Sequence, residues 1–400
     1  MIADLRRALG RVASKLYPGL DEALWNRRRN TEMAGLIASG GYELALRDLG
    51  SVAGSRPAHL VVVPQVGPEA DTWKAAGGNF FYEIAQGARE TYGAERVTIF
   101  GVAGDEPAHV WHQRLIRFLI ESGATHLIAQ VEADPNSGQQ LYSWDVFWSQ
   151  LHSRWDGVLL GLVTDSYFTW ITAGVRRLAR MSDRFMLVDI CMPMDGVLVR
   201  GRPEVGPVNM PVSDESLAVI DGACDGLERR YDVTFIGTLY PYRVELLDAL
   251  RAQGASVAVN PHRAVPAEDY ASSRADVPDY VDYMRALAQS RMTINFSQTN
   301  AGPQQQLKTR VLEAAAMGCL VLTDDVDRTD RFWTPEVEYG FFAGPSELPG
   351  VVDAWLSDPA RLEQARLAGQ AKARAINVSS FWGGIDEGLQ HRGLRPLRGD

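Results

Sequence analysis

Cysteine and long apolar runs are scarce in this 400-residue chain, and each scarcity excludes a class of protein. The three cysteines match neither the spacing of a metal-binding knuckle nor a disulfide framework, so we expect a reducing compartment. No run approaches the roughly 20 apolar residues that a membrane span needs, and the start lacks the apolar core of a signal peptide. These features predict a cytoplasmic protein.

Excess positive charge is also absent, because the formal net charge is −10. A bulk electrostatic affinity for DNA or RNA is therefore not expected, and we predict no nucleic-acid partner. The composition, 46% hydrophobic and 22% charged, is that of a globular chain long enough for two domains. Lysine is rare, so Lys308 is a mildly unusual choice among basic positions that are nearly all arginine.

The first 55 residues have apolar side chains at steps of three and four with arginines between them, which predicts helix. A basic amphipathic helix in residues 1–30 could lie on an anionic membrane surface and make the protein membrane-associated. More often such a helix packs on its own domain, and we favour that alternative.

From residue 59 the chain alternates β-branched strands with helical segments, which is typical of α/β layered domains. The expected strands are 59–66, 97–102, 126–131, 158–163 and 185–190, then 232–237, 255–259, 292–296 and 319–322. A stretch rich in proline and glycine separates the two series, as linkers do. We therefore predict two Rossmann-like domains facing across a cleft, residues 56–205 and 206–378, with a helical N-terminal extension, 1–55, and a C-terminal helix and tail, 379–400.

The second series contains the most informative segment, a helix expected from Leu307 to Met317 that ends at Gly318 and runs directly into a strand. In an α/β domain the start of such a helix faces the crevice where ligands bind. Lys308 and Arg310 place two cations near the amide-rich helix start, and Glu313 adds a carboxylate. Phosphate and sugar hydroxyls would suit this group.

Local sequence in this half resembles the group 1 glycosyltransferases of GT-B fold, closest to their spore-maturation-protein-like branch. The resemblance rests on Phe235-Ile236-Gly237 with Arg243, and on the pattern Lys-x-Arg-x-x-Glu at 308–313 before a small-residue helix and Gly318. It covers about residues 231–330, and residues 59–190 only as a pattern. It implies a bacterial transferase that moves a sugar from a nucleotide-diphosphate sugar, without a metal or other cofactor and with retention of configuration.

The resemblance also implies roles for single residues. Glu313 would bind the ribose hydroxyls, and basic residues of the second domain, Lys308 foremost, would hold the diphosphate and stabilise the leaving group. Gly237 and Arg243 would complete the donor site. Gln305 occupies the position where many members have a second glutamate, so it could contact the sugar but not supply negative charge.

Each of these residues also has a plainer interpretation. Glu313 could form an ion pair with Arg310 on a solvated helix face. Lys308 and Arg310 point in different directions on a helix, and the alternative for Arg310 is packing on the neighbouring strand. Arg243 could be an exposed arginine at a helix start.

The candidates on the acceptor side follow strands of the expected sheets. Asp165 would project into the cleft and could activate the acceptor, although a loop-capping aspartate is the more frequent outcome. Gly77 and Gly78 would let a ligand approach the backbone closely, or serve a turn alone. His262 could be a cleft residue or part of a turn, and His126 is expected to be a core histidine.

No metal site is expected, because the acidic stretch 325–327 is interpreted as a solvated loop. The sequence thus predicts a cytoplasmic GT-B glycosyltransferase. Its acceptor is left open among a glycan, a lipid-linked sugar, a protein and a small molecule. Two alternatives stay open at this point: a sugar-nucleotide epimerase of GT-B fold, and a non-catalytic binding subunit of the same fold.

Overall fold

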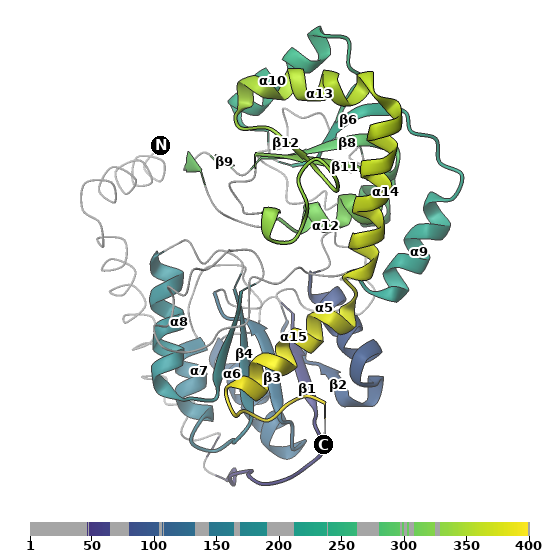
Figure 1. Ribbon diagram of the computed structural model, residues 1–400. Coiled ribbons are helices and arrows are strands. Elements are labelled where there is room, and N and C mark those ends of the chain that lie inside the picture. Colours follow the sequence, from purple (N-terminus) through teal and green to yellow (C-terminus); the bar gives the residue numbers. More distant parts are fainter. Residues whose placement is uncertain are drawn as a thin grey trace, which may run out of the picture.

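A computed structural model describes most of the chain in two α/β domains (Figure 1). The described residues are 46, 48–64, 80–103, 106, 108–132, 144–163, 169–189, 212–237, 239–261, 280–296, 298–299, 302–303, 308–324 and 329–398. Each domain is built on a five-stranded sheet in which all neighbouring strands are parallel. The predicted pair of Rossmann-like domains is confirmed.

The first domain has a sheet in the order β2-β1-β3-β4-β5 with helices on both faces. Its strands are β1 Leu60–Val63, β2 Val97–Ile99, β3 His126–Gln130, β4 Val158–Val163 and β5 Phe185–Asp189. Three helices cover one face: α6 Ala108–Glu121, α7 Trp144–Leu151 and α8 Thr169–Met181. The other face is covered by α5 Phe80–Tyr92 and by α15 Val378–His391 from the far end of the chain. Because both faces are buried, the strands are continuous apolar runs, as seen in the sequence.

The second domain repeats this plan with the order β7-β6-β8-β11-β12. Its strands are β6 Tyr231–Phe235, β7 Val257–Val259, β8 Ser290–Asn295, β11 Leu320–Thr323 and β12 Gly340–Phe341. One face packs on α9 Asp214–Cys224, α11 Tyr280–Ala288 and α12 Thr309–Ala316. The opposite face packs on α10 Pro241–Ala252, α13 Leu348–Ser357 and α14 Pro359–Ala375. Helix α12 lies on the side of this sheet that faces the first domain (Figure 1).

Both sheets therefore share one strand order, in which the second strand of the series lies outside the first and the third to fifth follow on the other side. In such a sheet the direction of winding reverses between the first and third strands, and ligands bind beyond the carboxyl ends of those two strands. In the second domain this switch point lies between β6 and β8. Residues that follow these strands are the first candidates for a site.

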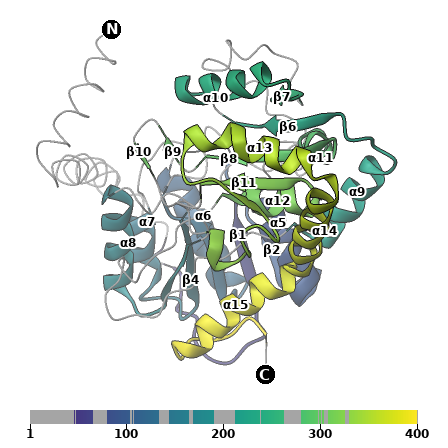
Figure 2. The same ribbon diagram turned by 45° about the horizontal axis from the view of Figure 1, so that its top comes forward.

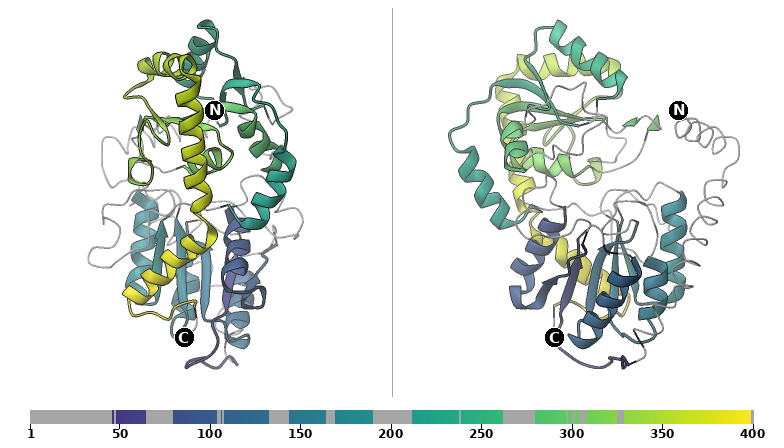
Figure 3. Two further views of the ribbon diagram at one scale, coloured as in Figure 1. Left: turned by 45° about the vertical axis from the view of Figure 1, so that its right-hand side comes forward. Right: turned by 180° about the vertical axis from the view of Figure 1, so that it is seen from behind.

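Helix α15 belongs to the first domain although it comes last in the sequence. Figure 3 shows α14 running along the second domain and α15 continuing onto the first. Trp382 is fully buried there, and its ring lies edge-on to the ring of Tyr92, with centroids 5.7 Å apart. The Tyr92 hydroxyl donates to Asp386 Oδ2 at 2.9 Å. The C-terminal helix was predicted, but not the surface on which it packs.

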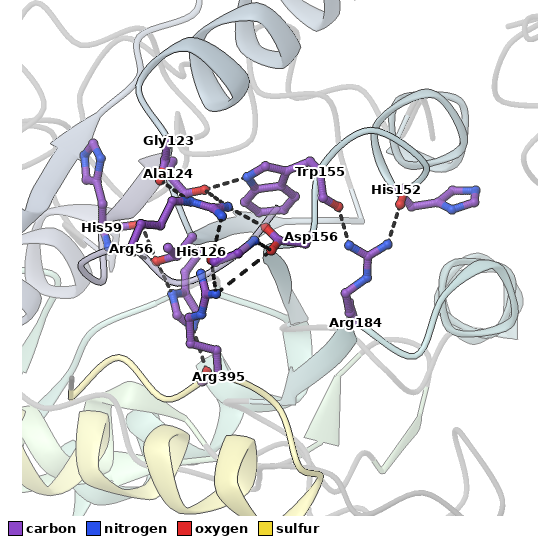
Figure 4. Close-up of polar contacts among 12 residues, drawn as sticks. Arg56, His59, Gly123, Ala124, His126, His152, Trp155, Asp156, Arg184 and Arg395 are labelled. Atoms are coloured by element: carbon purple, nitrogen blue, oxygen red, sulfur yellow. Dashed lines mark hydrogen bonds and ion pairs between the residues drawn. The ribbon is translucent and has the colours of Figure 1, made fainter. Parts of the chain in front are cut away.

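The C-terminal segment of the chain is hydrogen-bonded to residues at the amino-terminal edge of the first sheet (Figure 4). His126 Nε2 donates to the carbonyl of Arg395 at 2.9 Å, and its Nδ1 bonds to Thr125 Oγ1 at 2.8 Å. Arg56 pairs with Asp156, and Arg395 donates to the Gly54 carbonyl at 2.6 Å. Burial lowers the pKa of His126 to about 4, so its ring is neutral at physiological pH. The expectation of a core histidine is confirmed.

Some features were not predicted. Two short antiparallel strands, β9 Gln298–Thr299 and β10 Gly302–Pro303, and the edge strand β12 do not stand out in the sequence. Three short 3₁₀ segments, Ala94–Arg96, Thr329–Arg331 and Pro345–Glu347, were also missed. Within the described ranges no helix is long and apolar enough to cross a membrane. Residues 1–45 lie outside those ranges, so the amphipathic helix and its membrane contact stay predictions.

Candidate functional site at the switch point of the second sheet

The turn after β6 is held in place by one side chain. Gly237 has a φ of +146°, a backbone conformation that favours glycine. Asn260, which follows β7, accepts from the Gly237 amide through Oδ1 at 2.8 Å and donates from Nδ2 to the Gly237 carbonyl at 3.1 Å. Asn260 itself has a φ of 45°, which asparagine tolerates better than most residues. This pair fixes the backbone at the carboxyl end of β6.

Arg243, in the first turn of α10, bridges the two strands of the switch point. Its guanidinium lies 4.5 Å from the ring centroid of Tyr240. Three further rings are slightly more distant: Phe235 at the end of β6 at 5.5 Å, Phe296 after β8 at 5.4 Å and Tyr242 at 5.5 Å. Arg243 Nε donates to the Tyr242 hydroxyl at 2.8 Å. Arg243 is 7% exposed, so the alternative of an exposed helix-start arginine is wrong. A cation held among aromatic faces is stabilised there by the ring quadrupoles.

Helix α12 starts where the sequence placed the cationic group. Lys308 is the N-cap residue, and its side chain makes no capping hydrogen bond to the first turn. Lys308, Thr309 and Arg310 are all partly exposed. The helix ends as predicted, since Gly318 has a φ of +63° and its amide donates to the Ala315 carbonyl at 2.8 Å. The positive end of the helix dipole therefore lies beside two cationic side chains.

Arg310 extends from α12 towards the Gly237 turn. A Cβ atom added to Gly237 would lie 3.1 Å from Arg310 Nη2, so a larger residue there would crowd the guanidinium. The guanidinium is also 5.9 Å from the centroid of Phe235, the ring that Arg243 contacts as well, at 5.5 Å. Arg310 Nε is buried and has no hydrogen-bond partner. Arg310 thus packs on the neighbouring strand and borders the Gly237 turn at once.

Glu313 lies one turn further along α12, partly exposed, between two tyrosines of α11. The Tyr280 hydroxyl donates to Glu313 Oε1 at 3.1 Å, and the Tyr283 hydroxyl donates to Oε2 at 2.7 Å. Burial raises the pKa of Glu313, against the two tyrosine hydrogen bonds and the nearby charge of Arg310, which lower it. Burial also raises the pKa of both tyrosines, so they stay protonated donors. The partners of the carboxylate are therefore hydroxyls rather than the ion pair with Arg310 that was one of the two interpretations.

A second carboxylate approaches Glu313 from the first domain. Glu83, on α5, is buried and accepts hydrogen bonds from the Ser213 amide and, at 2.6 Å, from the Ser216 hydroxyl at the start of α9. Burial raises the pKa of Glu83, and the charge of Glu313 raises it further. Glu90, two turns along α5, accepts from the next two amides of α9 at 3.0 and 3.1 Å. Helix α5 thus caps the start of α9, against which it packs (Figure 2). Its Glu83 is a first-domain carboxylate close enough for the charge of Glu313 to act on it.

The structure brings together Gly237, Arg243, Arg310 and Glu313, with Lys308 at the start of the same helix. Gln305, Asp165, Gly77, Gly78 and His262 lie outside the described residues, so the acceptor side and the catalytic role of Asp165 stay predictions. Sequence reasoning missed Asn260, Tyr280, Tyr283 and Glu83. The order Asn260-Pro261 after a strand was a signal for a special turn, whereas nothing in the sequence paired the tyrosines with Glu313.

Charge and geometry define what this edge could bind. Three cations and the first-turn amides of α12 suit an anionic phosphate group, and a carboxylate with unused acceptor positions suits a vicinal diol. In the part of the chain that the structure describes, no group of three or more metal-ligating side chains gathers. The stretch 325–327 is outside that part, and metal independence stays a prediction.

Comparison with known proteins bears on this geometry. Residues 243–378, which contain most of these side chains, match the model of a family described as "Glycosyl transferase-like". A structure of Anabaena HepE in complex with UDP and glucose superimposes with a TM-score of 0.54 at 12% identity, covering 84% of this chain and 100% of that one. The chain has the GT-B fold. No curated protein sequence matches it.

Two further GT-B structures superimpose at 12% identity over 84% of this chain and 99% of theirs. One is an alpha-glucosyltransferase in complex with UDP and a 13-mer DNA, with a TM-score of 0.53. The other is a sucrose-phosphate synthase from Thermosynechococcus elongatus, with a TM-score of 0.50. The family match and the fold support the GT-B glycosyltransferase group, and the spore-maturation-protein-like branch stays a prediction. Because one GT-B protein holds DNA, the fold itself does not exclude a nucleic-acid partner, and that expectation now rests on net charge alone.

Proposed function

We propose that this protein is a glycosyltransferase that takes a sugar from a nucleotide-diphosphate donor bound at the switch point of the second sheet. The observation that carries the proposal is the meeting of Gly237, Arg310 and Glu313 at the carboxyl end of β6 and the start of α12. This meeting lies in the half of a GT-B fold that matches a glycosyl transferase-like family.

In this proposal the diphosphate lies against the first turn of α12, with Lys308 and Arg310 offsetting its charge. As the bond from the sugar to the β-phosphate breaks, negative charge grows on the departing phosphate, and fixed cations and amides lower the energy of that transition state. Glu313 accepts hydrogen bonds from the ribose hydroxyls, which fixes the nucleotide without taking part in the bond changes. Gly237 leaves room for the ligand and for Arg310 side by side.

The same proposal extends to the cofactor, the stereochemistry, the acceptor and the compartment. Transfer proceeds without a metal and with retention of the anomeric configuration, as the family resemblance implies. The acceptor is a glycan, a lipid-linked sugar or a protein bound by the first domain, with Asp165 and the glycines Gly77 and Gly78 on its side of the cleft. The protein acts in the cytoplasm.

Donor binding tests the proposal first. Among UDP-, GDP-, ADP- and dTDP-sugars, at least one should raise the melting temperature, because a ligand that binds only the native state stabilises it. Glu313→Ala should weaken that donor by about 1–3 kcal/mol, the cost of losing hydrogen bonds to a charged group. Isothermal titration calorimetry on the folded variant measures this loss.

Two results would count against the proposal. If none of the donors shifts the melting temperature while a control transferase responds, the protein has no sugar-nucleotide site. If Glu313→Ala binds as tightly as the wild type, the site lies elsewhere. Slow hydrolysis of the bound donor without acceptor would distinguish a transferase from a non-catalytic binding protein, and interconversion of two sugar nucleotides would indicate the epimerase instead.

A further inference from the structure

Tyr280 and Tyr283 form a matched pair around Glu313. They are three residues apart on α11, so both side chains lie on one face of that helix. Their rings are stacked, with centroids 5.9 Å apart and planes 20° from parallel. The two hydroxyls therefore point the same way, and each donates to a different oxygen of the carboxylate, at 3.1 and 2.7 Å. Two bonds to separate oxygens fix the rotation of the carboxylate as well as its position.

The pair leaves the carboxylate able to bind a ligand. A carboxylate has roughly four acceptor positions, and each tyrosine uses one on its own oxygen. Glu313 is only partly buried as a residue, and two acceptor positions of its carboxylate are not used by the tyrosines. A diol that binds there would meet two oxygens whose direction is already set. Less conformational freedom is then lost on binding, which is the general advantage of a preorganised site.

The surroundings of Glu313 oppose its ionisation, and the tyrosines offset that opposition. Burial favours the neutral acid, and Glu83 brings a second carboxylate close by from α5. The Tyr280 and Tyr283 hydroxyls and the guanidinium of Arg310 act in the opposite direction and favour the carboxylate. A hydroxyl that donates to a carboxylate stabilises its charged form. Without the tyrosines, Arg310 alone would stabilise the ionised form against the cost of burial and the repulsion from Glu83.

We propose that Tyr280 and Tyr283 are positioning residues that hold the Glu313 carboxylate ionised and correctly rotated for the donor. They act through Glu313 and need not touch the ligand. The ligand part of this inference rests on the proposed function, whereas the effect on Glu313 itself does not. The pH at which donor affinity falls then depends on the two tyrosine hydroxyls of α11, which act on the site through Glu313.

The test measures the titration of Glu313 directly. Protein labelled with ¹³C at the glutamate carboxyl is titrated by NMR, and the Glu313 signal is assigned by its loss in Glu313→Gln. In Tyr280→Phe and in Tyr283→Phe the midpoint should rise by roughly one pH unit, the equivalent of one hydrogen bond to a charged group. Tyr92→Phe is the matched control, because it removes a buried tyrosine hydroxyl that also donates to a carboxylate, Asp386, at the far end of α5. Its Glu313 midpoint should equal that of the wild type.

Calorimetric titration of UDP, GDP, ADP and dTDP supplies the second measurement. For the nucleotide that binds, affinity should fall on the acid side, and the fall should begin roughly one pH unit higher in the two phenylalanine variants. An unchanged Glu313 midpoint in both folded variants would overturn the positioning role, whether or not any nucleotide binds. Failure of all four nucleotides to bind the wild type would overturn the proposed donor site, and the NMR midpoint would still decide the role of the tyrosines. Each variant is first checked for a cooperative melting transition, and the single variants are compared separately so that one unfolded protein does not end the test.

Discussion

Removal of the Asn260 side chain should loosen the Gly237 turn and weaken the donor site with it. The Asn260 side chain hydrogen-bonds to both the amide and the carbonyl of Gly237. A typical hydrogen bond contributes about 0.5–1.5 kcal/mol, so the loss of two should lower the free energy of unfolding by about 1–3 kcal/mol. The freed turn would no longer hold Arg310 against a fixed backbone.

Two substitutions at this position separate the hydrogen bonds from the backbone conformation. Asn260→Gly removes both bonds but accepts the φ of 45° without strain, whereas Asn260→Ala removes them and also strains the backbone. We therefore expect Asn260→Ala to be the less stable of the two by roughly 1 kcal/mol. Urea unfolding followed by circular dichroism measures both differences, and UDP titration measures the effect on the site.

The reasoning would be refuted if both variants unfolded at the wild-type urea concentration and bound UDP with wild-type affinity. Equal losses of stability in the two variants would support the role of the hydrogen bonds and contradict the role of backbone strain. A large loss of stability without any change in UDP affinity would show that the Gly237 turn does not contribute to donor binding.

Two further predictions concern a contact between the domains and the core of the first domain. The pKa of Glu83 is raised above its ordinary 4.5, so the stability that this carboxyl contributes is fully present below pH 4.5 and is lost as the pH rises through the raised pKa. Melting temperatures measured from pH 4 to 8 should therefore show the wild type losing stability relative to Glu83→Gln as the pH rises. A difference that stays constant over this range would contradict the prediction. Trp382→Ala should lower the free energy of unfolding by about 3–5 kcal/mol, because it empties a fully buried site between α15 and α5. Limited proteolysis should then cut the first domain of the variant sooner than that of the wild type. Trp355→Ala, the same deletion in the core of the second domain, should instead make the second domain the first to be cut.

Much of the fold follows from local sequence because parallel strands buried on both faces must be continuous apolar runs. The strands β4 and β11 were predicted almost to the residue, since Val158–Val163 and Leu320–Thr323 are bounded by glycine, cysteine and polar residues. Strands of two residues such as β12 carry too little pattern to stand out. The packing of α15 on the first domain could not be predicted, because no local pattern in the sequence indicates which domain its apolar face covers.

The site was predictable where one short segment contains both the element and the chemistry. Lys308, Arg310 and Glu313 lie in six residues at a helix start, so the sequence alone brought them together. Arg243 was placed correctly at the edge of the sheet, but its aromatic surroundings come from Phe235, Tyr240, Tyr242 and Phe296, whose proximity is a tertiary fact. Asn260 and the tyrosines of α11 act across gaps of 23 to 33 residues, beyond any local pattern.

The position of the donor is tested most directly by hydrogen–deuterium exchange of the full chain with and without saturating UDP. If the donor lies at the switch point of the second sheet, UDP should slow exchange at the amides of Gly237 and of the first turn of α12, from Thr309 to Leu312. Amides of the amino-terminal edge of the first sheet, around His126 and Arg56, should exchange at an unchanged rate. Protection confined to the first domain, with Gly237 and α12 unaffected, would contradict the central claim.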